Sequence, residues 1–103
     1  MTMVSKDKEP KPEARLYALV HGRVQGVNFR YYATRTAQRL DLTGWVANRW
    51  DGTVEAVSEG ERIALQEFQD FLHRGPPSAV VQQVEVRWES PTGEFGRFGV
   101  RYR

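Results

Sequence analysis

The stretch Gly22-Arg23-Val24-Gln25-Gly26-Val27-Asn28-Phe29-Arg30 decides how this chain folds. An apolar segment precedes it and a segment of helical periodicity follows it, so it predicts a turn from a strand into a helix. The two glycines let backbone N–H groups turn toward one point, and a helix start adds donors with partial positive charge. Arg30 adds a guanidinium within one turn of that start. The stretch therefore predicts a site for a small, doubly charged anion.

The segments on either side of this stretch have clear periodicities. Residues 16–21 (LYALVH) are short and apolar, which predicts a strand with Leu16, Ala18 and Val20 on one side. Asn28 is a candidate N-cap for the helix that follows. The apolar stripe of this helix is expected to consist of Phe29, Tyr32, Ala33, Thr36, Ala37 and Leu40.

The rest of the chain predicts a hairpin, a second helix and two further strands. Residues 42–48 and 52–58 read as strands joined by an Asp-Gly turn, which favours an antiparallel hairpin. Residues 61–74 read as a helix with Leu65, Phe68 and Leu72 on its core face. Residues 80–89 form an alternating strand whose register slips at Val81, which suggests a bulge. Residues 97–102 end the chain as another strand, with Phe98, Val100 and Tyr102 on one face.

The order β-α-β-β-α-β plus a C-terminal strand predicts an α+β fold of the ferredoxin-like, split βαβ type. We expect an antiparallel sheet with two helices on one face. Residues 1–13 are charged and contain proline, so we expect a disordered tail, followed by one domain over residues 14–103.

Composition limits the chemistry that this chain can perform. Its 103 residues include 15 basic and 13 acidic side chains, a net charge of +2 that is weak support for nucleic-acid binding. The chain has no cysteine, which excludes a disulfide, a thiolate metal ligand and a thiol nucleophile. Its two histidines, His21 and His73, are far apart, so we expect neither a metal nor a cofactor. No apolar run is long enough to span a membrane, and we expect a cytoplasmic monomer.

Four segments together resemble the acylphosphatase family: GRVQGVNFR (22–30), GWVAN (44–48), GTV (52–54) and FGVRY (98–102). The resemblance covers roughly residues 15–103. It implies hydrolysis of the carboxyl–phosphate anhydride of a small acyl phosphate to carboxylate and phosphate, without a metal.

The resemblance also implies roles for particular residues. Arg30 matches the arginine that binds the phosphate, and Asn48 matches the asparagine that positions the attacking water. The backbone amides that hold the phosphate would come from Gln25, Gly26, Val27, Asn28 and Phe29.

The same chemistry is reasonable from the residues alone. Phosphoryl transfer asks a protein mainly for positioning and charge stabilisation, and a carboxylate leaves without a strong general acid. With cysteine absent and serine far from the loop, water is the expected nucleophile. An asparagine can orient water but does not readily take its proton. We hypothesise that a phosphate oxygen of the substrate accepts it.

The fold alone leaves other functions open, because RNA-recognition modules share this order of elements. Tyr17 on the first strand and the stretch 97–102 loosely resemble the aromatic motifs of such modules. However, the expected third strand carries no aromatic residue to stack a base. We therefore expect no nucleic-acid partner. The alternative is a non-catalytic RNA- or phosphate-binding module.

Overall fold

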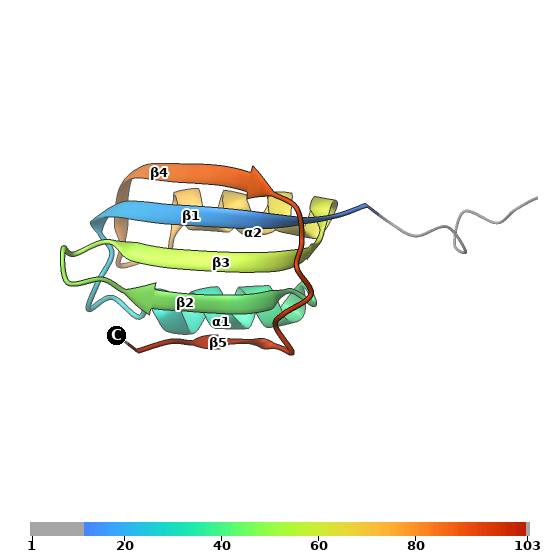
Figure 1. Ribbon diagram of the computed structural model, residues 1–103. Helices are drawn as coiled ribbons and strands as arrows, with labels where there is room; N and C mark the ends of the chain where they lie inside the picture. The colour runs from blue at the N-terminus through green and yellow to red at the C-terminus, as the bar shows by residue number, and fades with distance from the viewer. Residues whose placement is uncertain (1–11, 103) are drawn as a thin grey trace, which may run out of the picture.

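The computed structural model describes residues 12–102, so residues 1–11 of the expected tail lie outside the described residues. The elements are β1 (Glu13–Arg23), α1 (Phe29–Arg39), β2 (Thr43–Asn48), β3 (Val54–Glu61), α2 (Arg62–Arg74), β4 (Val80–Glu89) and β5 (Phe98–Val100). Within this range the five strands form one sheet in the order β4-β1-β3-β2-β5. Both helices lie on the same face of the sheet (Figure 1). The ferredoxin-like α+β fold expected from the sequence is confirmed.

The fifth strand corrects the expectation of a wholly antiparallel sheet. β5 runs parallel to β2, with residues 98–100 opposite residues 44–46. β4 and β5 occupy opposite edges, and the connection between them crosses one end of the sheet (Figure 1). Because β4 ends where β5 begins, β5 must run opposite to β4, which is the direction of β2.

Several boundaries differ from the expected ones because strand pairing sets them. β1 begins at Glu13 and ends at Arg23, longer than residues 16–21, because it pairs with β3 on one side and β4 on the other. β5 covers only residues 98–100, shorter than the expected 97–102. Tyr102 therefore lies beyond the strand and is 81% exposed, so its expected place on a shared face with Phe98 is wrong.

The expected bulge near Val81 is confirmed. His21 pairs with Gln83, whereas the next residue, Gly22, pairs with Val81, so Gln82 is the extra residue on β4. The bulge lets Val81 and Val84 both pack against the core, while Val80 stays 51% exposed. It also brings the backbone of β4 close to Gly22, where the stretch 22–30 begins.

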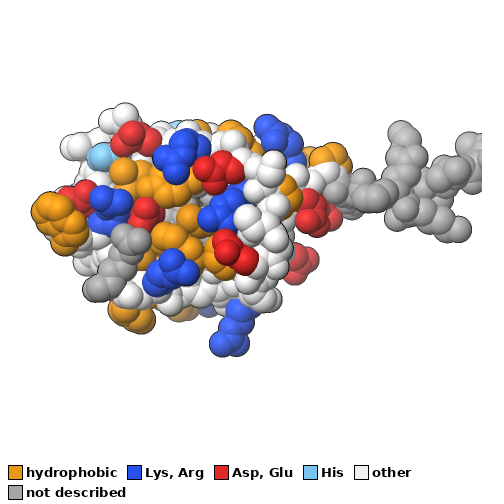
Figure 2. Space-filling view, in the orientation of Figure 1, with side chains coloured by type: hydrophobic (Ala, Val, Ile, Leu, Met, Phe, Trp, Pro, Cys, Tyr) orange, Lys and Arg blue, Asp and Glu red, His pale blue; other side chains and the backbone are white. Residues whose placement is uncertain are grey.

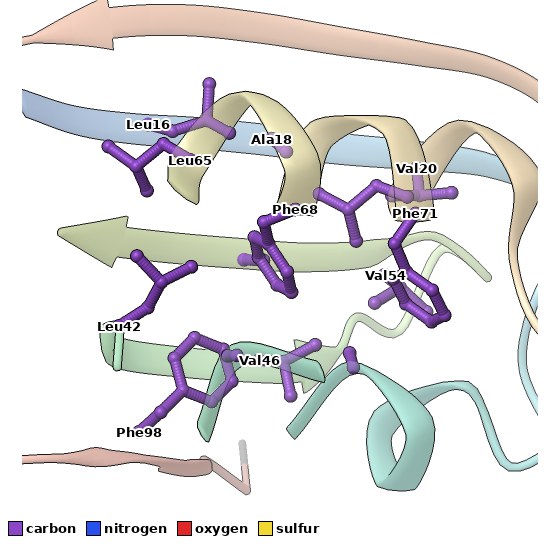
Figure 3. Close-up of a cluster of buried hydrophobic side chains, with 14 of the residues drawn as sticks. Leu16, Ala18, Val20, Leu42, Val46, Val54, Leu65, Phe68, Phe71 and Phe98 are labelled. Carbon is purple, nitrogen blue, oxygen red and sulfur yellow. The ribbon is translucent and has the colours of Figure 1, made fainter. Parts of the chain in front are cut away.

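The core lies between the sheet and the two helices (Figure 3). Helix α1 buries Phe29, Ala33 and Ala37, but Tyr32 is 41% exposed, so the expected stripe is too wide. Residues 29, 33 and 37, spaced by four, face the sheet. Tyr32 therefore lies to one side of this row and faces solvent. Helix α2 buries its expected core residues and also Phe71.

A chain of aromatic contacts joins the two sides of this core. Phe71 lies 5.9 Å from Phe29 at the start of α1 and 6.3 Å from Phe68, measured between ring centres. Phe68 in turn meets Phe98 of β5 edge to face at 5.7 Å. Aromatic pairs at these distances add stability beyond their buried area. The contacts therefore fix the start of α1 and the position of β5 relative to each other.

Glu59 binds the connection between β4 and β5 on the open face of the sheet, the face without helices. Its carboxylate accepts hydrogen bonds from the backbone amides of Thr92 and Gly93 at 3.0 and 2.9 Å, and from Arg15 at 2.9 Å. Burial alone would raise the pKa of Glu59. The hydrogen bonds from Gly93, Arg15 and Thr92 outweigh burial and lower the pKa to about 2.

We predict that Gly22→Ala destabilises the fold, because Gly22 has φ +130° and a Cβ there would lie 2.1 Å from the carbonyl oxygen of Val80. The free energy of unfolding should fall by at least about 2 kcal/mol. Urea denaturation measures the difference. Gly99→Ala is the control, because a Cβ at Gly99 meets nothing within 4 Å. Equal unfolding midpoints for the two variants would contradict the prediction.

We predict that the free energy of unfolding falls at acid pH because Glu59 becomes protonated. A carboxyl whose folded pKa is about 2, against 4.5 for the ordinary side chain, stabilises the fold above pH 4.5. That contribution, on the order of 3 kcal/mol, is lost as the pH falls from 4.5 to 2. Urea denaturation across this range should show a steep loss in the wild type and a flatter one in Glu59→Gln. The exposed Glu67→Gln variant should follow the wild type, and parallel curves for all three proteins would refute the assignment.

Candidate active site

A cleft of about 530 Å³ opens beside the loop that joins β1 to α1. One wall is the loop and the exposed side of α1. The other wall is the end of β2 at Asn48 and the C-terminal segment at Val100 and Tyr102. The tertiary structure thus brings the predicted loop, Arg30 and Asn48 to one cleft, although Asn48 lies on a different element.

The loop presents its backbone amides without internal partners. Among residues 12–102, no group accepts a hydrogen bond from the backbone amides of residues 25–31, and the first helical bond runs from Tyr32 to the carbonyl of Asn28 at 3.1 Å. Gly26 and Asn28 have positive φ values of 74° and 62°. Left-handed residues in a turn can arrange successive N–H groups as an anion-binding concavity. The loop and the helix start therefore form one continuous set of available donors.

Asn28 occupies the expected N-cap position but does not cap the helix through its side chain. A side-chain cap requires extended backbone angles, whereas Asn28 is left-handed with φ 62° and ψ 25°. Asparagine tolerates this conformation better than most residues. Its role in the structure is therefore to shape the loop.

Gln25 has a second role that the sequence did not reveal. Its side-chain amide donates hydrogen bonds to the carbonyls of Arg49 and Thr53, at 2.6 and 2.9 Å. These carbonyls belong to the turn between β2 and β3, directly after Asn48. The Gln25 side chain therefore fixes the distance between the loop and Asn48. Its partners lie 24 and 28 residues away along the chain, so no local pattern could have identified them.

Asn48 ends β2 at the wall of the cleft. Hydrogen bonds of its neighbours hold this end of β2: the amide of Arg49 donates to the carbonyl of Thr53, and the amide of Arg101 donates to the carbonyl of Val46, each at 2.9 Å. Its side-chain oxygen Oδ1 is buried and has no hydrogen-bond partner among the described residues. An unpaired buried acceptor costs about 1–3 kcal/mol. Such a cost is typical of a position where a ligand or a water molecule completes the pairing.

Arg30 is held by a ring instead of a carboxylate. Its guanidinium carbon lies 5.5 Å from the centre of the Tyr102 ring, and no ion pair to Arg30 occurs within residues 12–102. Among the described residues no acidic side chain lines the cleft, which Arg35 also lines. The charge of the cleft is therefore positive. Sequence reasoning missed Tyr102 as a residue of this site, because it placed Tyr102 on the face of a strand.

Two predicted loop residues do not line the cleft through their side chains. Gln25 turns toward the hairpin, and Val27 packs against the hydrophobic core. Gly26, Asn28, Phe29 and Arg30 do line it. Any contribution of Gln25 and Val27 to anion binding would come from their backbone amides alone.

The open face of the sheet gives no support to the RNA-binding alternative. Phe98 is only 2% exposed and cannot stack a base. The ring of Tyr17 is covered by the guanidinium of Arg87 at 4.1 Å, and its hydroxyl donates to Glu55 at 2.6 Å. Figure 2 shows arginine and carboxylate side chains interspersed on this face. A surface of mixed sign lacks the positive stripe that binds a phosphate backbone.

Neither a metal-binding cluster nor a membrane-spanning helix occurs in the part of the chain that the structure describes. Within it, no group of three or more His, Asp or Glu side chains is arranged to hold a metal ion. No helix of residues 12–102 is long and apolar enough to cross a membrane.

The described residues thus place available backbone amides and two arginines in one cleft, at a helix start on a ferredoxin-like sheet. Comparison with known proteins then gives the family, because the acylphosphatase profile matches residues 16–100. An acylphosphatase of Roseiflexus sp. (strain RS-1) is 49% identical over 84% of this chain and 94% of its own length. One of Trichormus variabilis is 54% identical over 80% of this chain and 81% of its own length.

Solved structures agree with these relatives. The crystal structure of acylphosphatase from Bacillus subtilis has a TM-score of 0.83 and 38% identity, and covers 86% of this chain and 99% of its own. An acylphosphatase from Coxiella burnetii has a TM-score of 0.81 and 38% identity, and covers 96% of this chain and all of its own. The chain belongs to the acylphosphatase family. It is an acylphosphatase enzyme, as its sequence resemblance implies.

We predict that Gln25→Glu disrupts the site more than Gln25→Ala. The carboxylate has no donor to offer the carbonyls of Arg49 and Thr53 and would repel both. Phosphate affinity should fall about tenfold in Gln25→Glu and less in Gln25→Ala, because the loop loses its fixed distance from Asn48. Isothermal titration with inorganic phosphate measures the change. Wild-type affinity in Gln25→Glu would show that the link to the hairpin is dispensable.

Proposed function

We propose that Arg30 and the backbone amides of the loop bind the phosphoryl group of an acyl phosphate, and that Asn48 positions the attacking water. The observation that carries the proposal is the meeting of three features in one cleft. Within residues 12–102, these are the backbone amides of residues 25–31 without acceptors, the guanidinium of Arg30 without an ion pair, and the unpaired oxygen of Asn48.

The phosphoryl group matches the donors on the loop side of the cleft. Its oxygens can accept from the N–H groups of Gln25, Gly26, Val27, Asn28 and Phe29, and from the fork of Arg30. Tyr102 supports the guanidinium from the side, which restricts its orientation without neutralising its charge. These donors would stabilise the charge that spreads over the phosphoryl oxygens in the transition state.

The reaction then needs a water in line with the bond that breaks. Oδ1 of Asn48 accepts a hydrogen bond from that water and points its oxygen at phosphorus. A bond forms from the water oxygen to phosphorus, and the bond from phosphorus to the acyl oxygen breaks. The electron pair of that bond leaves with the carboxylate, and the water proton passes to a phosphoryl oxygen. No side chain is required to donate a proton, because a carboxylate is a good leaving group.

The site is complete within one chain, since the loop, α1, β2 and the C-terminal segment all come from the same molecule. We therefore propose that the enzyme acts as a monomer on a small acyl phosphate. We also propose that it works in the cytoplasm, which the absence of cysteine favours, and without a nucleic-acid partner. Sedimentation at micromolar concentration tests the monomeric state, and cell fractionation tests the location in the cytoplasm. A stable dimer, or recovery outside the cytoplasm, would contradict them.

We predict that Arg30→Ala lowers kcat/KM for benzoyl phosphate by about a thousandfold or more, because it removes a charge and several donors at once. The assay is performed with EDTA, so that wild-type turnover also tests the metal-free mechanism. Arg39→Ala is the matched control, because Arg39 lies on the same helix and pairs with the exposed Glu67. An Arg30→Ala enzyme as active as Arg39→Ala would remove Arg30 from the site.

We predict that Asn48→Ala separates binding from turnover. The loop and Arg30 remain in place, so the inhibition constant of inorganic phosphate should stay within about threefold of the wild type. The kcat for benzoyl phosphate should fall about a hundredfold or more, because the water loses its acceptor. Steady-state kinetics with phosphate as inhibitor measure both quantities. A raised inhibition constant with unchanged kcat would assign Asn48 to phosphate binding instead.

A further inference from the structure

The cleft continues beyond the phosphate loop along α1, and this part carries a second arginine. Arg35 lines the same cleft as Arg30, together with Tyr31, Thr34 and Gln38. The rise of an α-helix places Arg35 about 7.5 Å from Arg30 along the axis. A substrate whose phosphoryl group lies at the loop can therefore extend its acyl group along residues 31–38.

Arg35 is positioned by a tyrosine and not by an acid. Its guanidinium donates a hydrogen bond to the Tyr31 hydroxyl at 2.9 Å and lies 5.7 Å from the centre of the Tyr31 ring. Helix α1 contains no acidic residue, and within residues 12–102 Arg35 forms no ion pair. By contrast, Arg39 of the same helix lies 3.3 Å from the Glu67 carboxylate. A guanidinium has five N–H donors, so Arg35 retains donors for a ligand.

Thr34 provides a second, independent observation in this part of the cleft. Its hydroxyl oxygen is buried and has no hydrogen-bond partner among the described residues. A threonine inside a helix commonly bonds back to the carbonyl four residues earlier, but this one does not. Thr34 lines the cleft between Arg30 and Arg35, so a small rearrangement would let its hydroxyl donate to an oxygen of the acyl group.

We propose that Arg35 forms a subsite for a second anionic group on the acyl part of the substrate. The preferred substrates are then acyl phosphates whose acyl group ends in a carboxylate or a phosphate. This inference rests on the proposed function of the cleft, because the phosphoryl group must lie at the loop for the acyl end to reach Arg35.

The exposure of Arg35 limits how strongly the enzyme can prefer a substrate with a second anionic group. Arg35 is exposed, so its attraction for an anion is partly screened by water and salt. A charge-assisted hydrogen bond in that setting gives about a five- to tenfold preference. The preference should shrink as salt is raised, which distinguishes an ionic contact from a fit of shape.

The test compares substrates of equal shape and different charge. We would measure kcat/KM for 4-carboxybenzoyl phosphate and for 4-carbamoylbenzoyl phosphate, its uncharged analogue. The wild type should prefer the carboxylate about five- to tenfold, and Arg35→Gln should reduce this ratio to about one. Arg39→Gln removes the same charge from the same helix and should keep the wild-type ratio. A third substrate, 4-phosphonobenzoyl phosphate, shows which of the two anions the subsite prefers.

Each outcome decides the inference. A ratio that Arg35→Gln leaves unchanged overturns it, although the proposed function stands if benzoyl phosphate is still hydrolysed. An equal loss for charged and uncharged substrates also overturns it, because Arg35 would then act on the phosphoryl group. A wild type that hydrolyses none of these substrates refutes the proposed function, and the inference fails with it. Loss of the preference in Tyr31→Phe, which lacks the positioning hydroxyl, would support it further.

Discussion

The backbone amides of residues 25–31 must be held in place although nothing else in the described chain accepts their hydrogen bonds. Unpaired donors are costly when buried, and they are useful only when they keep a fixed arrangement. The surrounding structure supplies that arrangement. Phe29 anchors the helix start in the core, and Gln25 anchors the loop to the hairpin. The site depends on these two anchors.

The sheet topology explains how distant segments reach the same cleft. β5 returns across the end of the sheet to pair with β2, and this places Tyr102 over Arg30. The Glu59 carboxylate secures the crossing connection on the open face of the sheet. A carboxylate that stabilises the connection thus helps to set the position of the C-terminal segment that closes the cleft.

Aromatic support of arginine recurs on both parts of the cleft. Arg30 lies over Tyr102 and Arg35 lies over Tyr31. A carboxylate partner would hold each guanidinium more strongly but would neutralise it. A ring restricts the side chain and leaves its charge and most of its donors for a ligand. We therefore propose that the cleft binds a phosphoryl group at one end and contacts the acyl group at the other.

The sequence by itself determined the order of elements, the loop over residues 22–30 and the family, because periodicity and local motifs depend on neighbouring residues. It predicted the bulge near Val81 for the same reason. Only the tertiary structure decided the parallel direction of β5, the place of Tyr102 and the bonds from Gln25 to the hairpin. Each of these depends on contacts between residues far apart in the chain. No local pattern encodes which distant carbonyl or ring a side chain meets once the sheet has formed.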